Sequence, residues 1–464
     1  MSAPLHQLTI AEAAPLIERR ELSPVDLTEA FLARIEAVNP KLDAFVCVTP
    51  DRARADARRA ADEIAAGNYR GPLHGIPVGI KDIYDTAGIL TTCHSHVHAD
   101  RVPERDARSV EMLRDAGAVM LGKLATHEFA FGGPSWDLPF PPARNPWDPT
   151  RFTGGSSSGS GAATAGGLAM AAMGSDTAGS IRMPAHFCGV AGIKPTYGRV
   201  SRRGVAPLAY SLDHCGPLAW TAHDCALVMQ AVAGFDPADP GSADRPVPDY
   251  AAALDGDLKG MRIGVVRHFY DGDDHADADV KGAMDGALAA FAGMGATVED
   301  VRLSPLQDFH ACGMTIMLSE AFAIHEPVLK TTPEKYGEIF RDRMMISGLL
   351  TSADYVQALR MRRQLTAEVD AMLARYDVLV TASGWTPAPE LGHVPKFYLF
   401  ERALLTMPFD VSGHPAMTVC NGFSPAGLPV GMQIVGAAFA DATVLRVGDA
   451  YERATAWRSR RPQI

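Results

Sequence analysis

The sequence predicts a large α/β protein, and three observations support this prediction. The chain has 464 residues, of which 47% are hydrophobic and 21% charged, as in globular proteins and unlike disordered chains or coiled coils. From Gly71 onward, short runs rich in β-branched residues alternate with amphipathic stretches, the pattern of a sheet with crossover helices. The 43 glycines and 33 prolines are spread along the chain without repeats, which indicates many tight turns.

Residues 1–66 are expected to form a helical segment packed on the core. Ser23-Pro24 provides an N-cap and a first-turn proline, apolar residues follow at helical spacing, and Asn39-Pro40 is expected to end this helix. A second helix is expected over 52–66. We interpret residues 67–464 as one α/β domain, because no stretch resembles a free linker between two cores.

Further elements follow in order along that domain. Strands are expected at Ile76–Ile80, Val119–Leu121, Val190–Ile193, Met261–Val266, Val378–Val380 and Met417–Val419. Helices are expected at Gly161–Gly174, Lys281–Gly293, Ala353–Ala374 and Asp441–Ala454. Residues 235–258 are rich in Asp and Pro and are predicted to be a loop. A helical cap is expected between about 300 and 375, within a variable substrate-pocket region of about 300–410.

Charge and cysteine usage restrict the partners and the compartment. The net charge is −11 and there is no long basic run, which argues against a nucleic-acid partner. The seven cysteines are scattered, so disulfide frameworks and thiolate zinc sites are disfavoured and a reducing cytoplasm is favoured. We see neither an export signal nor an apolar run long enough to span a bilayer, and expect a cytoplasmic protein without a membrane partner.

A glycine- and serine-rich cluster occupies residues 154–161. It lacks the Lys-Ser/Thr ending of a phosphate-binding loop. Gly155 to Gly159 also fits the G-x-S-x-G pattern of a nucleophile elbow around Ser157, although the preceding residues predict a turn rather than the required strand. A plain Gly/Ser turn remains the alternative.

A second cluster, Asp176 to Ala185, places Ser180 after a glycine-containing turn. Backbone N–H groups in such a turn can converge on one point, as an oxyanion hole requires. Taken alone this indication is weak, because most serines in turns have no catalytic role.

Lys81 follows an apolar strand and is expected to face away from its neighbour Asp82, because side chains alternate along a strand. Gly79 lies on the same face as Lys81 and leaves room for another backbone segment. A buried lysine without a carboxylate partner has a lowered pKa and can act as a base near neutral pH. The alternative is an edge lysine that reaches water.

Histidines 94, 96 and 98 alternate beside Cys93, which allows metal chelation geometrically. Asp100 is the single close carboxylate and no second cysteine lies nearby. A surface or loop cluster is therefore favoured, and we expect no metal site.

Taken together, these segments resemble the amidase signature family over most of the chain. The matching segments are Gly71–Asp82, Gly122–Gly132, Asn145–Arg199, Ser211–Thr221, Gly413–Val419 and Gly427–Gly436. The order and spacing of Lys81, Ser156 and Ser180 are similar to those of the family's Ser-Ser-Lys triad. The resemblance implies a single large α/β/α domain with a mixed, twisted central sheet covered by helices, and no cofactor.

The resemblance also implies a role for each matched residue. Ser180 is the implied nucleophile of an acyl-enzyme, Ser156 a bridging serine joined to Gly155 by a cis peptide bond, and Lys81 the base. Oxyanion-hole N–H groups are implied at Thr177, Ala178, Gly179 and Ser180. Substrate-binding residues are expected at Ala130, Phe131, Gly132 and Trp385. An aromatic acyl or aryl pocket is one interpretation of Trp385, Phe397, Tyr398 and Phe400, and core packing is the other.

Two positions depart from the family pattern. Ala178 replaces the first of two glycines before the nucleophile, so a position that tolerates a positive φ is expected to be lost. His94 replaces a glycine in the family's T-T-x-G-S turn, which either brings an imidazole near the pocket or reshapes a loop. Residues 305–410 match no subfamily that we identify.

The leading hypothesis is a stand-alone amidase that hydrolyses the C–N bond of a small, apolar or aryl amide, with anilides, carbamates and esters chemically accessible. The alternative is the A subunit of a glutamine-dependent aspartyl/glutamyl-tRNA amidotransferase, which Ser211–Asp236 resembles well. The tyrosine-rich stretch of such subunits is missing from Ser319–Arg343. A non-catalytic binding protein would be expected to lack a triad residue. A homodimer is left open as the assembly.

Overall fold

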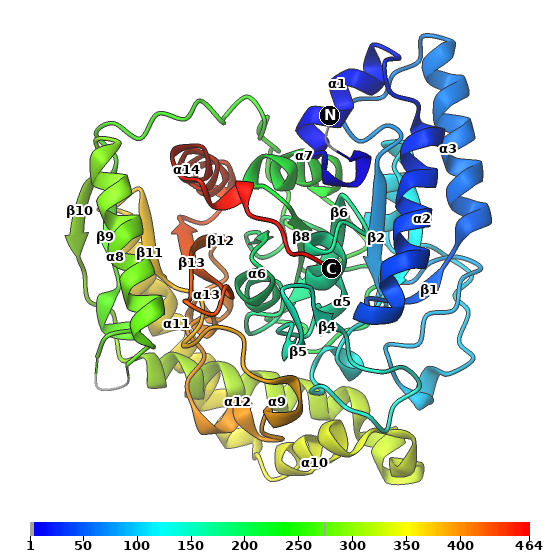
Figure 1. Cartoon of the computed structure of the whole chain (residues 1–464). Helices are drawn as coiled ribbons and strands as arrows, with labels where there is room; N and C mark the ends of the chain where they lie inside the picture. The colour runs from blue at the N-terminus through cyan, green and yellow to red at the C-terminus, as the bar shows by residue number, and fades with distance from the viewer. Residues whose placement is uncertain (1–3, 273–274) are drawn as a thin grey trace.

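The computed structural model describes residues 4–272 and 275–464, and its centre is an 11-stranded mixed sheet (Figure 1). The strand order is β1-β3-β2-β6-β8-β7-β12-β13-β11-β9-β10. These strands are β1 (Phe45–Val48), β2 (Pro77–Lys81), β3 (Val119–Leu124), β6 (Ala171–Asp176), β7 (Ala191–Lys194), β8 (His214–Ala219), β9 (Arg262–Val265), β10 (Thr297–Asp300), β11 (Val378–Ala382), β12 (Ala416–Phe423) and β13 (Pro429–Gly436). The predicted α/β class with a mixed sheet is confirmed.

Parallel pairs lie toward the two ends of this sheet, and antiparallel pairs fill its centre from β6 to β11. Strand β2 is paired in parallel with β3 on one side and β6 on the other, so it is an internal strand. Strands β6 and β8 are antiparallel, as are β12 and β13. A separate two-stranded hairpin consists of β4 (Arg144–Asn145) and β5 (Asp148–Phe152). The central strands are buried along their whole length, which explains their continuous apolar or small-residue sequences.

Helices cover the sheet and extend below it (Figure 1). They are α1 (Ile10–Glu18), α2 (Pro24–Leu42), α3 (Pro50–Ala65), α4 (Arg108–Asp115), α5 (Ser158–Ala165), α6 (Arg182–Cys188), α7 (Ala222–Val232), α8 (Ala278–Gly293), α9 (Leu306–Thr331), α10 (Glu338–Ser347), α11 (Ser352–Leu373), α12 (Tyr398–Glu401), α13 (Met407–Val411) and α14 (Asp441–Ala454). Helices α9 to α11 form the helical region that the sequence predicts between about 300 and 375. Within the described residues, no helix is both long and apolar enough to cross a bilayer.

The N-terminal segment differs in two details from the prediction. Helix α2 continues through Pro40 and ends at Leu42, where Asp43 adopts a left-handed conformation with φ +50°. The proline is tolerated because it lies in the last turn, where few intrahelical bonds remain to be lost. The segment also contains β1, which pairs with β3 at the edge of the sheet and was not predicted.

The predicted helix over Gly161–Gly174 is wrong in its second half. The helix α5 ends at Ala165, Gly167 has φ +68°, and the chain then forms the central strand β6. A run of small apolar residues fits a buried helix and a buried strand equally well, so periodicity cannot separate them. The glycine pair at 166 and 167 was the boundary signal.

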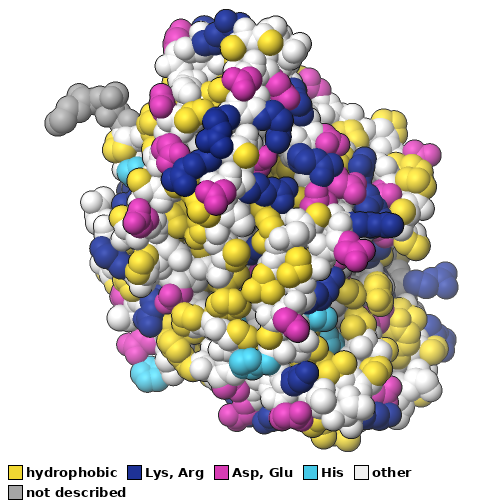
Figure 2. Space-filling model, turned by 90° about the vertical axis from the view of Figure 1, so that its right-hand side faces the viewer, with side chains coloured by type: hydrophobic (Ala, Val, Ile, Leu, Met, Phe, Trp, Pro, Cys, Tyr) yellow, Lys and Arg dark blue, Asp and Glu magenta, His cyan; other side chains and the backbone are white. Residues whose placement is uncertain are grey.

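The surface mixes both signs of charge. Figure 2 shows basic and acidic side chains interspersed over one face of the molecule. Exposed ion pairs occur among the described residues, such as Arg54 with Glu29 between α3 and α2 at 2.7 Å. On this face, no large patch of a single sign is visible.

Candidate active site

Lys81 is the last residue of β2 and its side chain is fully buried. Its Nζ donates hydrogen bonds to three hydroxyls: Ser156 Oγ at 2.8 Å, Ser157 Oγ at 3.0 Å and Ser175 Oγ at 2.8 Å. Burial lowers the pKa of Lys81 to about 7, against the opposing influence of the Asp176 carboxylate. An edge lysine that reaches water is therefore ruled out, and an amine that is partly neutral near pH 7 takes its place.

The opposite face of the same strand end carries Asp82, as strand alternation predicts. Its carboxylate accepts hydrogen bonds from Thr92 N at 3.0 Å and Thr92 Oγ1 at 2.6 Å, and lies 3.4 Å from Lys123 Nζ. The space at Gly79 is filled by the Leu124 side chain and not by another backbone segment, which corrects our expectation. Asp82 therefore anchors the neighbouring loop and leaves Lys81 without a carboxylate on its own strand.

The loop before α5 holds Ser156. The Gly155–Ser156 peptide bond is cis, as expected. A side chain at Gly155 would collide with the His127 imidazole, since a Cβ there would lie 1.9 Å from His127 Cε1. Ser157 is buried with its hydroxyl between Lys81 and the Ser175 backbone, so it is not an exposed nucleophile elbow.

Ser180 lies in the turn that connects β6 to α6, and its side chain is partly exposed. The turn is tied to the Ser156 loop because Ser157 N donates to Ser180 O at 3.2 Å. Thr406 Oγ1 donates to Ala178 O at 2.6 Å from the other side. Ala178 does not have a positive φ, whereas Gly179 has φ +123°, so the alanine fits this turn without strain.

Among residues 177–180 of this turn, one backbone N–H group is hydrogen-bonded within the protein, and three others are free of acceptors in the described parts of the chain. Gly179 N donates to Asp176 Oδ1 at 2.5 Å, so it is not available to an oxyanion, and our expectation for Gly179 needs correction. The backbone N–H groups of Thr177, Ala178 and Ser180 have no protein acceptor among residues 4–272 and 275–464. These three are the donors that remain for an oxyanion.

Asp176 organises the turn from within the core. Its carboxylate also accepts from Ile181 N at 3.1 Å and pairs with Arg182 Nε at 2.9 Å. Burial alone would raise the pKa of Asp176, but the Arg182 guanidinium outweighs burial and holds this pKa below its usual range. Arg182 is fully buried and also pairs with Asp410, so the turn rests on a compensated buried ion cluster.

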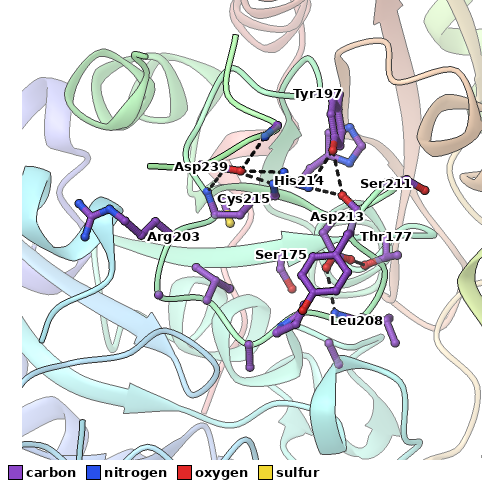
Figure 3. Close-up of a pocket in the computed structure, with 18 of the residues that line it drawn as sticks. Ser175, Thr177, Tyr197, Arg203, Leu208, Ser211, Asp213, His214, Cys215 and Asp239 are labelled. Atoms are coloured by element: carbon purple, nitrogen blue, oxygen red, sulfur yellow. Dashed lines mark hydrogen bonds and ion pairs between the residues drawn. The ribbon is translucent and has the colours of Figure 1, made fainter. Parts of the chain in front are cut away.

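Ser180 lines one small cavity, and two larger cavities share lining residues with it. We call the first the serine cavity; its walls include Ser156, Ser180 and the turn 177–179, and its volume of about 20 Å³ is room for one water molecule. The aromatic cavity, about 230 Å³, is lined by side chains that include Phe152, Phe187, Trp385 and Tyr398. The polar cavity, about 630 Å³, is lined by side chains that include Ser175, Thr177, Asp213 and Asp239 (Figure 3).

The expected substrate-binding residues are divided among these cavities. Ala130, Phe131 and Gly132 line the serine cavity, and Ala130 also lines the polar cavity. Trp385 lines the aromatic cavity but not the serine cavity, and Arg402 stacks 3.6 Å from its ring centroid. Tyr398 lines both the serine and the aromatic cavity, whereas Phe397 and Phe400 line neither.

The three alternating histidines after Cys93 lie outside the three cavities. His94 is buried with φ +58°, and its Nε2 lies 2.9 Å from Phe140 O, outside the three cavities. His96 and His98 lie on the short 3-10 helix that follows. No group of three or more His, Cys, Asp or Glu that could hold a metal occurs within the described parts of the chain.

Sequence reasoning missed several residues of the site. His127 lines the serine cavity and stacks on Phe152 with a centroid distance of 5.8 Å, and burial holds its pKa well below the usual value. Ser175 and Asp176 end the unpredicted strand β6. Asp176 begins the cluster Asp176 to Ala185 and Ser175 directly precedes it, so a strand assignment there would have found them.

Comparisons with known proteins identify the family of the chain. The family model described as Amidase matches residues 26–445. The chain is 41% identical to the A subunit of a glutamyl-tRNA(Gln) amidotransferase from Geobacter metallireducens, over 99% of this chain and 100% of that protein.

Solved structures show the same fold. A structure from a vestigial protein complex of an s-triazine catabolic enzyme has a TM-score of 0.90 and 33% identity, covering 96% of this chain and 98% of that one. The peptide amidase of Stenotrophomonas maltophilia has a TM-score of 0.86 and 30% identity, covering 99% of each chain. A match over nearly the whole chain in sequence and in fold leaves one assignment: the chain belongs to the amidase family.

Proposed function

We propose that the protein hydrolyses the C–N bond of a small amide through an acyl-enzyme on Ser180. The observation that carries this proposal is the buried Lys81 amine, which donates to Ser156 at 2.8 Å while Ser156 and Ser180 line the same small cavity. A neutral amine behind two hydroxyls is a proton acceptor for nucleophilic attack by the second hydroxyl.

The proposed reaction has two stages. Ser180 Oγ attacks the amide carbonyl, its proton passes through Ser156 to Lys81, and the free N–H groups of Thr177, Ala178 and Ser180 support the oxyanion. The same relay returns the proton to the nitrogen, the C–N bond breaks and the amine leaves. Water then attacks the Ser180 ester and gives a proton to the relay. The relay returns this proton to Ser180 Oγ as the acyl C–O bond breaks, and the carboxylic acid leaves.

The aromatic cavity supports an apolar or aryl acyl group. It shares Met183, Tyr398 and Leu404 with the serine cavity, so an acyl chain on Ser180 reaches it directly. Its volume of about 230 Å³ suits a ring-sized substituent. The described lining of the serine cavity contains no Asp, Glu, Lys or Arg, which favours an uncharged group next to the scissile bond.

A second candidate is the A subunit of a glutamine-dependent tRNA amidotransferase. The comparisons favour it over a stand-alone amidase, because curated relatives of that description are 38–41% identical over 99% of this chain. The serine cavity has no charged lining residue, but the adjoining aromatic cavity includes Glu401 and Arg402, so the cavities do not exclude the charged amino-acid end of glutamine. The missing tyrosine-rich stretch in Ser319–Arg343 favours the first candidate.

One experiment separates the two candidates. The purified chain is assayed alone against glutamine, benzamide-type aryl amides, anilides and carbamates, with Ser180→Ala as the control. Hydrolysis of aryl amides by the isolated chain, lost in Ser180→Ala, supports a stand-alone amidase. Glutaminase activity that appears once partner subunits have been added supports the amidotransferase. Full activity in Ser180→Ala would overturn both.

We also propose a cytoplasmic location, and the choice between a monomer and a homodimer is left to experiment. All seven cysteines are free, as suits a protein of the reducing cytoplasm. Light scattering on the purified chain would distinguish a monomer from the homodimer that the sequence left open.

A further inference from the structure

The polar cavity and the aromatic cavity meet the serine cavity on different sides. The polar cavity shares Ala130, Thr177 and Leu208 with it, and the aromatic cavity shares a separate set that contains Met183 and Tyr398. The two large cavities have no lining residue in common. If the acyl group of an amide occupies the aromatic cavity, the nitrogen substituent on the other side of the carbonyl points toward the polar cavity.

The polar cavity has a mostly apolar wall that carries a few polar side chains, and it is open to solvent on one side. Its volume is about 630 Å³, and Tyr210 on its wall is 60% exposed, so the cavity opens to solvent there. Ser175, which accepts a hydrogen bond from Lys81 Nζ, lies on its inner wall. The cavity thus extends from the lysine relay to the surface.

Most charges on its walls are already neutralised. Arg202 pairs with Asp239 at 2.8 Å, and Arg203 pairs with Glu111 at 2.7 Å and with Asp236 at 2.9 Å. In Figure 3, Asp239 and Asp213 lie on different parts of the cavity wall.

Asp213 is different. Its carboxylate accepts hydrogen bonds from neutral donors: Thr177 Oγ1 at 2.7 Å, Leu208 N at 2.9 Å and Ala209 N at 3.0 Å. Within the described residues it has no basic side chain at ion-pair distance. Figure 3 shows Asp213 beside Thr177, which is the first residue of the turn between β6 and α6. Burial raises the pKa of Asp213 to about 6, while these hydrogen bonds and the charge of Arg202 oppose that rise. In its ionised form, a carboxylate without a salt-bridge partner at this place attracts a cation.

We propose that the polar cavity receives the amine leaving group, and that Asp213 makes it prefer an amine substituent that carries a positive charge. This inference rests on the proposed function. The bond changes are those given above: the C–N bond breaks, the nitrogen takes the proton that Ser180 gave up, and the amine departs through the cavity. A second, permanent ammonium on the substituent faces Asp213 throughout the reaction.

The test compares two amides with the same aryl acyl group. One has an N-(2-aminoethyl) substituent, which is cationic, and the other has the neutral N-(2-hydroxyethyl) substituent of similar size. For the wild-type chain we expect kcat/KM to be about tenfold higher for the cationic amide, as partly buried charge pairs produce. In Asp213→Asn this ratio should fall to about one, while Asp51→Asn, an exposed carboxylate on α3, should keep it.

The ratio of kcat/KM for the cationic and the neutral amide separates binding of the cation by Asp213 from effects of Asp213 on the catalytic step. The Asp213 carboxylate also raises the pKa of Lys81, so its loss changes the relay, but that change is common to both amides and cancels in their ratio. An unchanged ratio in Asp213→Asn would overturn the proposal. So would a dependence on Asp213 that follows charge on the acyl group, because the substrate would then bind in the reverse direction.

A binding measurement serves if Asp213→Asn does not fold. Ethylenediamine and ethanolamine are titrated into Ser180→Ala by calorimetry, and tighter binding of the diamine is expected. Equal affinity for the two would contradict the proposal. The assay of the purified chain against amides tests the proposed function separately. If no hydrolysis there depends on Ser180, the proposed function is refuted.

Discussion

The amine of Lys81 is suited to the proposed role of base because its strand is internal to the sheet. A lysine at an edge would keep its proton to high pH, whereas β2 is internal and three hydroxyls surround Nζ without a carboxylate in the same shell. Hydroxyls stabilise an ammonium less than water and a counterion do, so burial dominates. The pKa of Lys81 therefore falls to about 7.

Replacing this amine should remove most of the activity and leave the fold intact. We expect Lys81→Met to lower kcat by about 10³-fold, within the range for loss of a general base, because the relay then has no proton acceptor. Steady-state kinetics and thermal unfolding measure the two effects. Lys330→Met, an exposed lysine on α9, is the control and should change neither. An unaffected rate in Lys81→Met would assign Lys81 a structural role.

The pKa of Lys81 also predicts how the activity depends on pH. The reactive form of Lys81 is neutral, so kcat/KM should rise with pH through about 7 and level off about one unit above it. The His127 imidazole does not contribute an ascending limb in this window, because burial keeps its pKa well below 6.5 and it stays neutral. A rate that is flat between pH 6 and 8 would contradict a lysine base.

Two residues that depart from the family pattern have different consequences. Ala178 occupies a place where φ is not positive, so the missing glycine is not needed. His94 adopts φ +58°, a conformation that glycine adopts more easily, and its ring contacts Phe140 instead of the cavities. His94 therefore shapes a loop and does not bring an imidazole to the serine cavity.

Among the elements, the turn between β6 and α6 depends on one buried carboxylate. Asp176 accepts from the Gly179 and Ile181 amides and pairs with Arg182, and Arg182 in turn donates to Thr406 O and Gln433 Oε1, both at 2.8 Å. The ion cluster thus fixes the end of a central strand to segments more than two hundred residues away.

Asp176→Asn should uncouple this turn. The buried Arg182 guanidinium would lose one of its two carboxylates, and we expect the free energy of unfolding to fall by about 3 kcal/mol, as for a broken buried pair. Activity should also fall, because the turn presents Ser180. Urea unfolding gives the first quantity, with Asp62→Asn on exposed α3 as the control. Wild-type stability in Asp176→Asn would show that Asp410 alone compensates Arg182.

At the scale of the whole molecule, the N-terminal segment is part of the core. Leu27 and Phe31 of α2 are fully buried, β1 extends the sheet beside β3, and Ala125 N donates to Ala44 O at 2.9 Å. Ala125 O in turn accepts from Gly159 N at the start of α5, next to the Ser156 loop. The N-terminal segment is therefore connected by backbone hydrogen bonds, through Ala125, to the start of α5 beside the Ser156 loop.

Removal of residues 1–66 should abolish the cooperative fold. The deletion exposes the apolar surface under α2 and frees the edge of β3, which favours aggregation. We expect an insoluble product or loss of a single thermal transition. A soluble, active chain of residues 67–464 would show instead that the α/β part folds alone.

The aromatic cavity is also a product of the whole fold, because its walls come from segments near 152, 187, 385 and 398. Trp385→Ala should raise KM for aryl amides by about tenfold relative to acetamide, since an apolar ring contact worth about 1.4 kcal/mol is lost. Trp136→Ala, an exposed tryptophan outside the three cavities, should leave the ratio unchanged. Equal effects on both amides would assign Trp385 to packing.

Local sequence signals were sufficient for the fold class and for most helices. The amphipathic runs predicted at Lys281–Gly293, Ala353–Ala374 and Asp441–Ala454 correspond to α8, α11 and α14 within a few residues. Strands such as β6, β8 and β13 were missed because they are buried on both faces and lack alternation. Period alone does not distinguish such strands from buried helices or loops.

What the sequence alone determined is the chemistry of the candidate site: a lysine after an apolar strand and two serines in glycine-rich turns, in a family order. What the tertiary structure decided is which groups are free to act. Burial between β3 and β6 lowers the pKa of Lys81, Asp176 takes the Gly179 amide, and Asp213 is left without a cation beside a large cavity. Each depends on contacts between distant segments, which local patterns do not specify.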